Sequence, residues 1–189
     1  MAALTAIVVI LQTAVMIPLG PFTITLTLVP IILGAILYGP AAGAVLGAVF
    51  GVVVSIQVVT GAAGLYSFMM FEYNPVLTIA VCLIKGAAAG WVSGLVHKLC
   101  TSMQKGKLGV ILAALICPIV NTGIFALALM TLFRTLADTW AMENQYASIF
   151  AFTMLFMIGL NFVVEFAINV LLSPVVFTII KAVRRQIQR

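Results

Sequence analysis

The sequence predicts an all-α integral membrane protein with six transmembrane helices and both termini on the cytoplasmic side. Of its 189 residues, 65% are apolar and only 7% are charged, whereas soluble domains carry about 25% charged residues. Residues 1–71 contain no charge, and the first charged residue is Glu72. The apolar runs are continuous rather than alternating, which favours helical spans over the strands of a membrane β-barrel.

Proline, glycine and polar stretches divide the chain into six apolar segments. The expected spans cover residues 1–17, 24–38, 41–60, 76–97, 108–133 and 148–180. A span needs about 20 residues, because each residue adds about 1.5 Å and the hydrocarbon core is about 30 Å thick. The sixth segment is longer than that, so it must tilt, kink near Pro174 or project beyond the bilayer. Residues 1–189 are expected to form a single transmembrane domain.

The basic residues are concentrated on one side of this arrangement. Seven of the nine lie at the termini or in the 97–107 connection, namely Lys98, Lys105, Lys107, Lys181, Arg184, Arg185 and Arg189. The opposite side carries Arg134 and three acidic residues, and Lys85 lies inside a span. Under the positive-inside rule the basic side is cytoplasmic. The 1–17 segment has no basic residue before its apolar run, so a cleaved signal peptide is not expected.

Several common chemistries have no signature in this sequence. There is no glycine-rich loop followed by Lys-Ser or Lys-Thr, so no P-loop is expected. A metal site needs three or four converging ligands, and one histidine with three scattered cysteines does not supply them. An intramembrane enzyme that used Glu165 or Lys85 as acid or base would need a nucleophile or metal, and neither is found. We therefore expect no enzyme activity, no cofactor and no nucleic-acid partner.

Small residues recur at helical spacing in two of the spans. The third span contains Gly43, Gly47 and Gly51. The fourth span contains Gly86, Gly90 and Gly94. A spacing of four places glycines on one helix face and lets a neighbouring backbone approach closely. Tight packing within the chain is the favoured interpretation, and a dimer interface is the alternative.

Two ionisable residues lie deep inside predicted spans. Lys85 follows Pro75 by about 15 Å of helix, near the bilayer midplane. Glu165 lies near the centre of the sixth span. A charge at that depth costs about 2.5–3.5 kcal/mol, so both side chains should face the protein interior. They form either a buried ion pair that fixes the helix register or part of a ligand site.

Further polar and aromatic residues accompany these charges. A polar stripe on the sixth span comprises Asn161, Glu165, Asn169 and Ser173 at intervals of four, and Asn121 adds an amide to the fifth span. The outward connections 16–27 and 61–75 are apolar and rich in threonine or aromatic residues. Such segments either cover an amphipathic ligand or anchor the chain at the headgroup region.

Several segments form a recognisable pattern: the Pro/Gly-rich connection after Ile17, the LTLVPIILGA and YGPAAGA motifs between residues 26 and 45, and the segments 83–90 and 117–125. In these segments the chain resembles the substrate-binding (S) components of energy-coupling factor (ECF) vitamin transporters. This resemblance implies a subunit of a prokaryotic cell membrane that captures a vitamin from outside. That subunit would dock on a transmembrane T component driven by two cytoplasmic ATPases. An AxxxA motif on the first helix faces the T component in this family, and Ala2 and Ala6 occupy that position here.

The ligand is not determined by the sequence. The first connection and second span most resemble the pantothenate-type branch of this family, whereas the aromatic residues would suit a ring ligand such as riboflavin or folate. The residues expected to bind it are Lys85, Asn121, Glu165, Asn161, Tyr66, Asn74 and Thr27. An alternative function is a self-sufficient secondary transporter for a small organic solute, with Lys85 and Glu165 as a proton-coupled pair.

Overall fold

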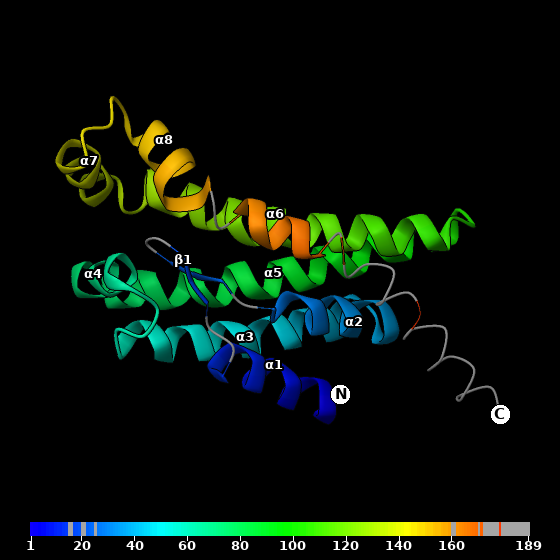
Figure 1. Cartoon of the computed structure of the whole chain (residues 1–189). Coiled ribbons are helices and arrows are strands. Elements are labelled where there is room, and N and C mark those ends of the chain that lie inside the picture. Colours follow the sequence, from blue (N-terminus) through cyan, green and yellow to red (C-terminus); the bar gives the residue numbers. More distant parts are fainter. Residues whose placement is uncertain are drawn as a thin grey trace.

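The computed structural model describes residues 1–14, 17–19, 22–24, 26–159, 162–169, 171 and 178. Its elements in chain order are α1 (Ala2–Ala14), β1 (Ile17–Leu19), β2 (Phe22–Ile24), α2 (Leu28–Tyr38), α3 (Pro40–Val59), α4 (Leu65–Tyr73), α5 (Pro75–Ser102), α6 (Gly106–Thr131), α7 (Arg134–Glu143), α8 (Ile149–Ala151), the π-helix η1 (Phe152–Ile158) and a helix over Phe162–Asn169. Figure 1 shows α3, α5 and α6 running along the length of the molecule, with α4 and α7 at one end.

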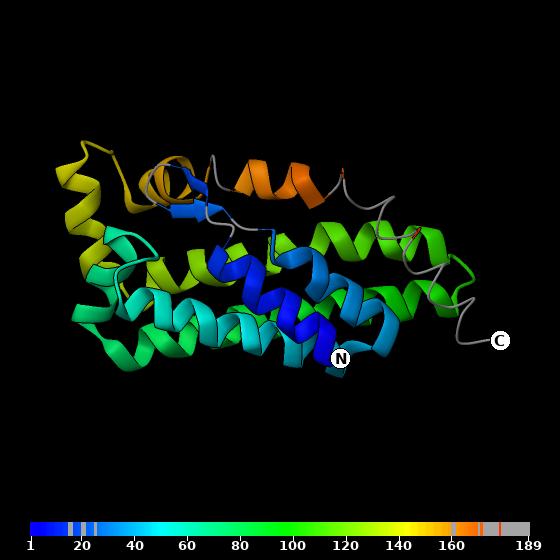
Figure 2. The same cartoon turned by 60° about the horizontal axis from the view of Figure 1, so that its bottom comes forward.

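Among the described residues, three helices are long and apolar enough to cross a membrane by themselves: α3, α5 and α6, with 20, 28 and 26 residues. α1 and α2 are apolar but have only 13 and 11 residues, which gives them lengths of about 20 Å and 16 Å. In Figure 2, α1 lies in front of α3 and beside α2. These five helices lie within or close to the first five expected spans, and the six-span count remains a prediction.

The sixth apolar segment is bent rather than continuous. Ile149–Ile158 and Phe162–Asn169 meet at an angle of 49°, and the two together count as a fourth possible span. The first half includes η1, in which the backbone is wound more loosely than in an α-helix. This bend lies well before Pro174, which is outside the described residues, so the expected kink near Pro174 stays a prediction.

The connections that are expected to face outward have more regular structure than expected. The 61–75 connection contains α4, and the segment after Arg134 forms α7. The first connection forms a two-stranded antiparallel hairpin in which Ile17 pairs with Ile24 and Leu19 with Phe22. Within the described part of the chain, this hairpin is the exception to an otherwise helical fold.

The recurring glycines join α3 to α5 through their backbones. A Cβ atom at Gly47 would overlap the carbonyl oxygen of Gly86, and one at Gly43 would overlap that of Gly90. A Cβ at Gly51 would lie 2.6 Å from the carbonyl oxygen of Cys82, closer than real Cβ contacts. The prediction of tight packing within the chain is therefore confirmed. We call this contact, formed by Gly43, Gly47, Gly51, Gly86 and Gly90, the glycine seam.

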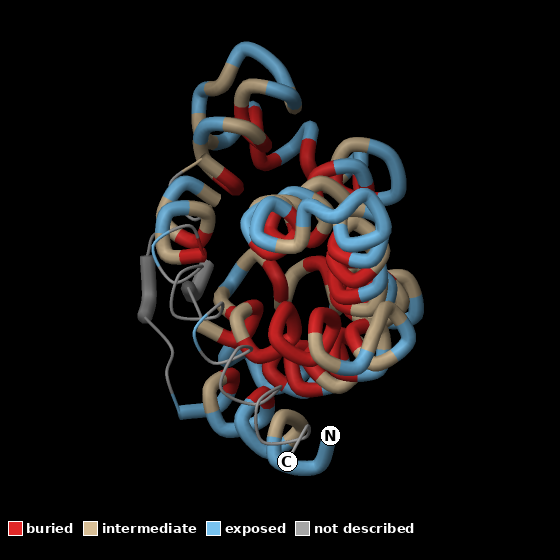
Figure 3. Tube along the Cα trace, turned by 90° about the vertical axis from the view of Figure 1, so that its right-hand side faces the viewer, coloured by how far each residue is buried: buried red, intermediate tan, exposed pale blue. Residues whose placement is uncertain are grey.

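Buried residues gather where the helices face one another, and exposed residues cover the outside of the bundle (Figure 3). One apolar cluster joins α1, α2, α3, α5 and α6, with Val8, Ile31, Leu46 and Cys117 almost fully buried. A second cluster fills the end near α4, α7 and η1 around Trp140. Both clusters contribute residues to the lining of the cavity described next.

Candidate ligand-binding site

A cavity of about 100 Å³ opens between the helices where the glycine seam ends. Its walls come from α1, α3, α4, α5, α6, η1 and the Phe162–Asn169 helix. The polar side chains in the lining are Gln12, Gln57, Ser67, Thr78, Lys85, Asn121, Thr122 and Glu165. Aromatic and aliphatic residues such as Phe50, Val54 and Phe125 form much of the remainder. An apolar space with a few converging polar groups is typical of a small-molecule site.

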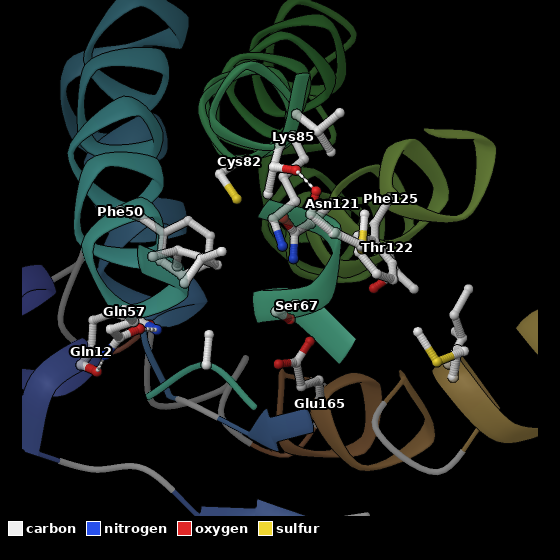
Figure 4. Close-up of a pocket in the computed structure, with 18 residues that line it drawn as sticks. Gln12, Phe50, Gln57, Ser67, Cys82, Lys85, Asn121, Thr122, Phe125 and Glu165 are labelled. Atoms are coloured by element: carbon white, nitrogen blue, oxygen red, sulfur yellow. Dashed lines mark hydrogen bonds between the residues drawn. The ribbon is translucent and has the colours of Figure 1, made fainter. Parts of the chain in front are cut away.

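Three of the residues singled out from the sequence meet in this cavity. Lys85 and Asn121 extend into it from α5 and α6, and Glu165 faces them from the other side (Figure 4). Asn121 and Glu165 are 8% and 7% exposed, and Lys85 is partly buried. The Nζ atom of Lys85 lies 5.2 Å from the centre of the Phe125 ring, within reach of a cation–π contact.

Lys85 and Glu165 do not form a direct ion pair. Within the described part of the chain, the structure contains one ion pair, an exposed contact of 3.9 Å between Arg134 and Asp138 on α7. A buried Lys85–Glu165 pair that fixes the helix register is therefore not formed. The two charges are held at opposite sides of the cavity instead (Figure 4).

A buried network of amide side chains forms one wall of the cavity. Gln12 Nε2 donates to Gln57 Oε1 at 2.9 Å, and Gln57 Nε2 donates to the Gln12 backbone carbonyl at 2.7 Å. Thr27 Oγ1 completes the network by donating to Gln12 Oε1 at 2.9 Å. The sequence reasoning missed Gln12 and Gln57, although each is the only amide side chain in its helix. That isolation in an apolar helix is the signal that would have identified them.

The side-chain carbonyl of Asn121 is a hydrogen-bond acceptor to which no described group donates. This Oδ1 atom is buried and accepts no hydrogen bond from the residues that the structure describes. A buried acceptor left without a donor costs about 1–3 kcal/mol. A ligand N–H or O–H would remove that cost.

Three of the other expected site residues, Tyr66, Asn74 and Thr27, lie outside the cavity lining. Tyr66 packs edge-on against Trp140, with ring centres 4.9 Å apart, in the aromatic cluster beside α7. Asn74 caps α5 by accepting a hydrogen bond of 3.0 Å from the Leu77 backbone N–H. Thr27 orients Gln12 rather than facing the cavity. Asn161 is outside the described residues.

α1 presents different faces to the cavity and to the outside. Gln12 is 4% exposed and lines the cavity. Ala2 and Ala6 are exposed, and so are Ile7 and Ile10. The AxxxA positions are therefore open on the surface of this structure.

A helical, strongly apolar chain that encloses a polar-lined cavity is a membrane-embedded binding protein. The family model for the substrate-specific component of ECF transporters matches residues 1–177. The chain belongs to that family, whose members are transporter subunits rather than enzymes. Among curated proteins no match is found.

Proposed function

We propose that this protein captures a small water-soluble vitamin from outside the cell and delivers it through an ECF-type importer. The cavity carries this proposal, because it combines a polar interior with enclosing apolar walls. Lys85 and Asn121 bind the polar groups of the vitamin. Glu165 and Asn161 either join them or orient Lys85. Pantothenate, riboflavin and folate are candidate ligands.

The cavity lies in the half of the molecule that we assign to the outside. Lys98, Lys105 and Lys107 are exposed around the connection between α5 and α6, at the opposite end of the bundle from α4 and α7 (Figure 1). The α4 and α7 end carries Arg134 beside acidic residues. We propose six spans with the lysine-rich end in the cytoplasm, in agreement with the positive-inside rule.

The partners in this proposal are a T component and two cytoplasmic ATPases. We propose that Ala2 and Ala6 contact the T component, because small exposed residues spaced by four allow two helices to approach closely.

Reconstitution in proteoliposomes tests the proposed function. The chain alone should bind a vitamin but not transport it, and uptake should begin only when the T component, both ATPases and ATP are added. Ala6→Trp should abolish this uptake and leave vitamin binding nearly unchanged, since position 6 lies away from the cavity. Uptake by the chain alone, driven by a proton gradient, would contradict the proposal and establish a secondary transporter.

A further inference from the structure

We infer that Ser67 and Thr122 select a ligand that carries alcohol hydroxyl groups. This inference rests on the proposed function and narrows its ligand. Both residues line the cavity, Ser67 from α4 and Thr122 from α6, where it follows Asn121 (Figure 4).

These two hydroxyls differ from most others in the described helices. Ser93 on α5 and Thr131 on α6, for example, each donate to the backbone carbonyl four residues earlier, at 2.7 and 2.6 Å. Such a bond satisfies a hydroxyl where water is absent, as it is inside a bilayer. Ser67 and Thr122 make no such bond, and no other group in the described part of the chain bonds to either hydroxyl.

The same contrast holds within the cavity lining. The hydroxyl of Thr78 donates to the backbone carbonyls of Met70 and Asn74, at 2.8 and 2.9 Å, so its donor is already used. Ser67 is only 8% exposed, yet its hydroxyl is left to bond with whatever enters the cavity. The buried Asn121 Oδ1 atom also lacks a donor among the described residues. Two hydroxyls and one carbonyl oxygen are therefore available to a ligand.

An alcohol is the ligand group that matches all three. A carboxylate only accepts hydrogen bonds, so it cannot supply the donor that Asn121 Oδ1 needs. An ammonium only donates, and it adds a charge to a mostly apolar enclosure. An amide divides the two roles between two atoms, whereas an alcohol combines them at one atom without charge. Of the candidate vitamins, pantothenate and riboflavin carry alcohol hydroxyls and folate does not.

The first probe is a defined mixture of water-soluble vitamins that includes pantothenate, riboflavin, folate and biotin. Purified wild-type protein is equilibrated with the mixture, washed and denatured, and the retained vitamin is identified by mass spectrometry. We expect a vitamin with alcohol hydroxyls. A retained vitamin without them, such as folate or biotin, would overturn the inference and leave the proposed function intact. If the protein retains no more of any vitamin than an empty micelle does, the proposed function itself fails.

Removal of either protein hydroxyl should weaken binding of the retained vitamin. Ser67→Ala and Thr122→Val should each raise its Kd about tenfold, because a polar group of the vitamin loses its partner in an enclosed space. The melting temperature should change little, since neither hydroxyl bonds to the described part of the chain. Thr122→Ser restores a hydroxyl and should recover most of the lost affinity. An unchanged Kd in both single variants would overturn the inference.

Ser55→Ala and Thr131→Val are the matched controls. Each removes a hydroxyl that bonds to its own helix and lies outside the cavity lining. Ser55 is 8% exposed, as Ser67 is, so the two alanine variants are matched in burial. Both controls should bind the vitamin as the wild type does. A tenfold loss in the controls as well would show that the effect is not specific to the cavity, and would overturn the inference.

An analogue of the vitamin without hydroxyls separates a direct contact from a change in cavity shape. For pantothenate it is the form in which hydrogen replaces both hydroxyls, and for riboflavin it is lumiflavin, in which a methyl group replaces the hydroxylated chain. The analogue should bind the wild type at least about tenfold more weakly than the vitamin. Ser67→Ala and Thr122→Val should weaken the analogue much less than the vitamin, because the interaction that they remove is already lost.

Equal losses for vitamin and analogue would overturn the assignment of these two residues. If Thr122→Val does not fold, Thr122→Ala replaces it with the same expectation.

Discussion

The two halves of the α3–α5 pair differ in what lies between the helices. In the half that we assign to the cytoplasmic side, the glycine seam brings backbone against backbone with no room for a side chain. In the other half the same helices present Val54 and Gln57 from α3, and Thr78 and Lys85 from α5, to the cavity. The cavity begins where the glycines end.

Within this one helix pair, the close-packed half contributes to stability and the other half contributes side chains to the cavity. Close packing gains dispersion energy without adding a polar group to the bilayer. The other half of the pair lines open space instead. An apolar groove on the side away from the cavity is lined by Val52, Ser55, Ile56, Val59, Thr60, Ile79 and Leu83. The close-packed half can therefore fix the positions of groups in the open half.

Enlarging a residue of the glycine seam should have the largest effect. In Gly47→Leu the new side chain would meet the Gly86 backbone, which cannot rotate away. We expect destabilisation at or beyond the upper end of the about 1–3 kcal/mol typical of overpacking. The measurement is the melting temperature together with the monodisperse yield in detergent. Gly123→Leu in α6 is the control, since nothing lies within 4 Å of its Cβ position. Equal yields of the two variants would contradict the backbone contact.

The amide network should show the next largest effect. Gln57→Leu leaves Gln12 with unsatisfied polar atoms in an apolar wall, so we expect a loss of about 1–3 kcal/mol in stability. Gln12→Leu combined with Gln57→Leu should cost less than the sum of the single losses, because their mutual interaction disappears in both. Chemical denaturation in detergent measures the three values. Additive losses would show that the two amides act independently.

Part of this architecture follows from the sequence because its causes are local. Glycines spaced by four predict a close helix contact. Gly43 and Gly47 of α3 make that contact with α5 of the same chain. Lys85 and Glu165 stand out because charges are rare inside spans. The amide network was missed because uncharged Gln12 and Gln57 are weaker signals, and their pairing depends on how α1 and α3 are placed.

The connections 16–27 and 61–75 were harder to predict for a different reason. Their composition is apolar, so hydropathy does not distinguish a loop from a short packed helix such as α4. Tyr66 and Asn74 were selected for their chemistry, but their surroundings give them packing and capping contacts. The surroundings of Tyr66 depend on Trp140 of α7 and Phe152 of η1, which are distant along the chain. The cap formed by Asn74 is a local contact with Leu77.

The charges in the open half should be coupled less strongly than a direct ion pair in the unliganded protein. A direct buried ion pair would cost about 3–5 kcal/mol when one partner is removed and recover much of it in the double variant. Since Lys85 and Glu165 line one cavity without pairing directly, the losses of Lys85→Met and Glu165→Gln should be smaller than that, and the double variant should recover little of them. Unfolding of the two single variants and the double variant, without ligand, checks this. A clear recovery of stability in the double variant would restore the ion-pair interpretation.

The last prediction concerns variants that should have no effect on stability or binding. They report only on which side of the membrane each end of the bundle lies. Met103 and Met142 lie at opposite ends of the bundle and are 65% and 79% exposed, so a cysteine at either position should leave the fold intact. In a background free of Cys82, Cys100 and Cys117, a membrane-impermeant maleimide should label Met142→Cys on intact cells. It should label Met103→Cys only after permeabilisation, because the positive-inside rule places the nearby Lys98, Lys105 and Lys107 in the cytoplasm.

Labelling of both positions from the same side would contradict the six-span arrangement. Reversed labelling would place the glycine seam outside and the cavity inside, and the cavity would then be unable to capture a vitamin from the exterior.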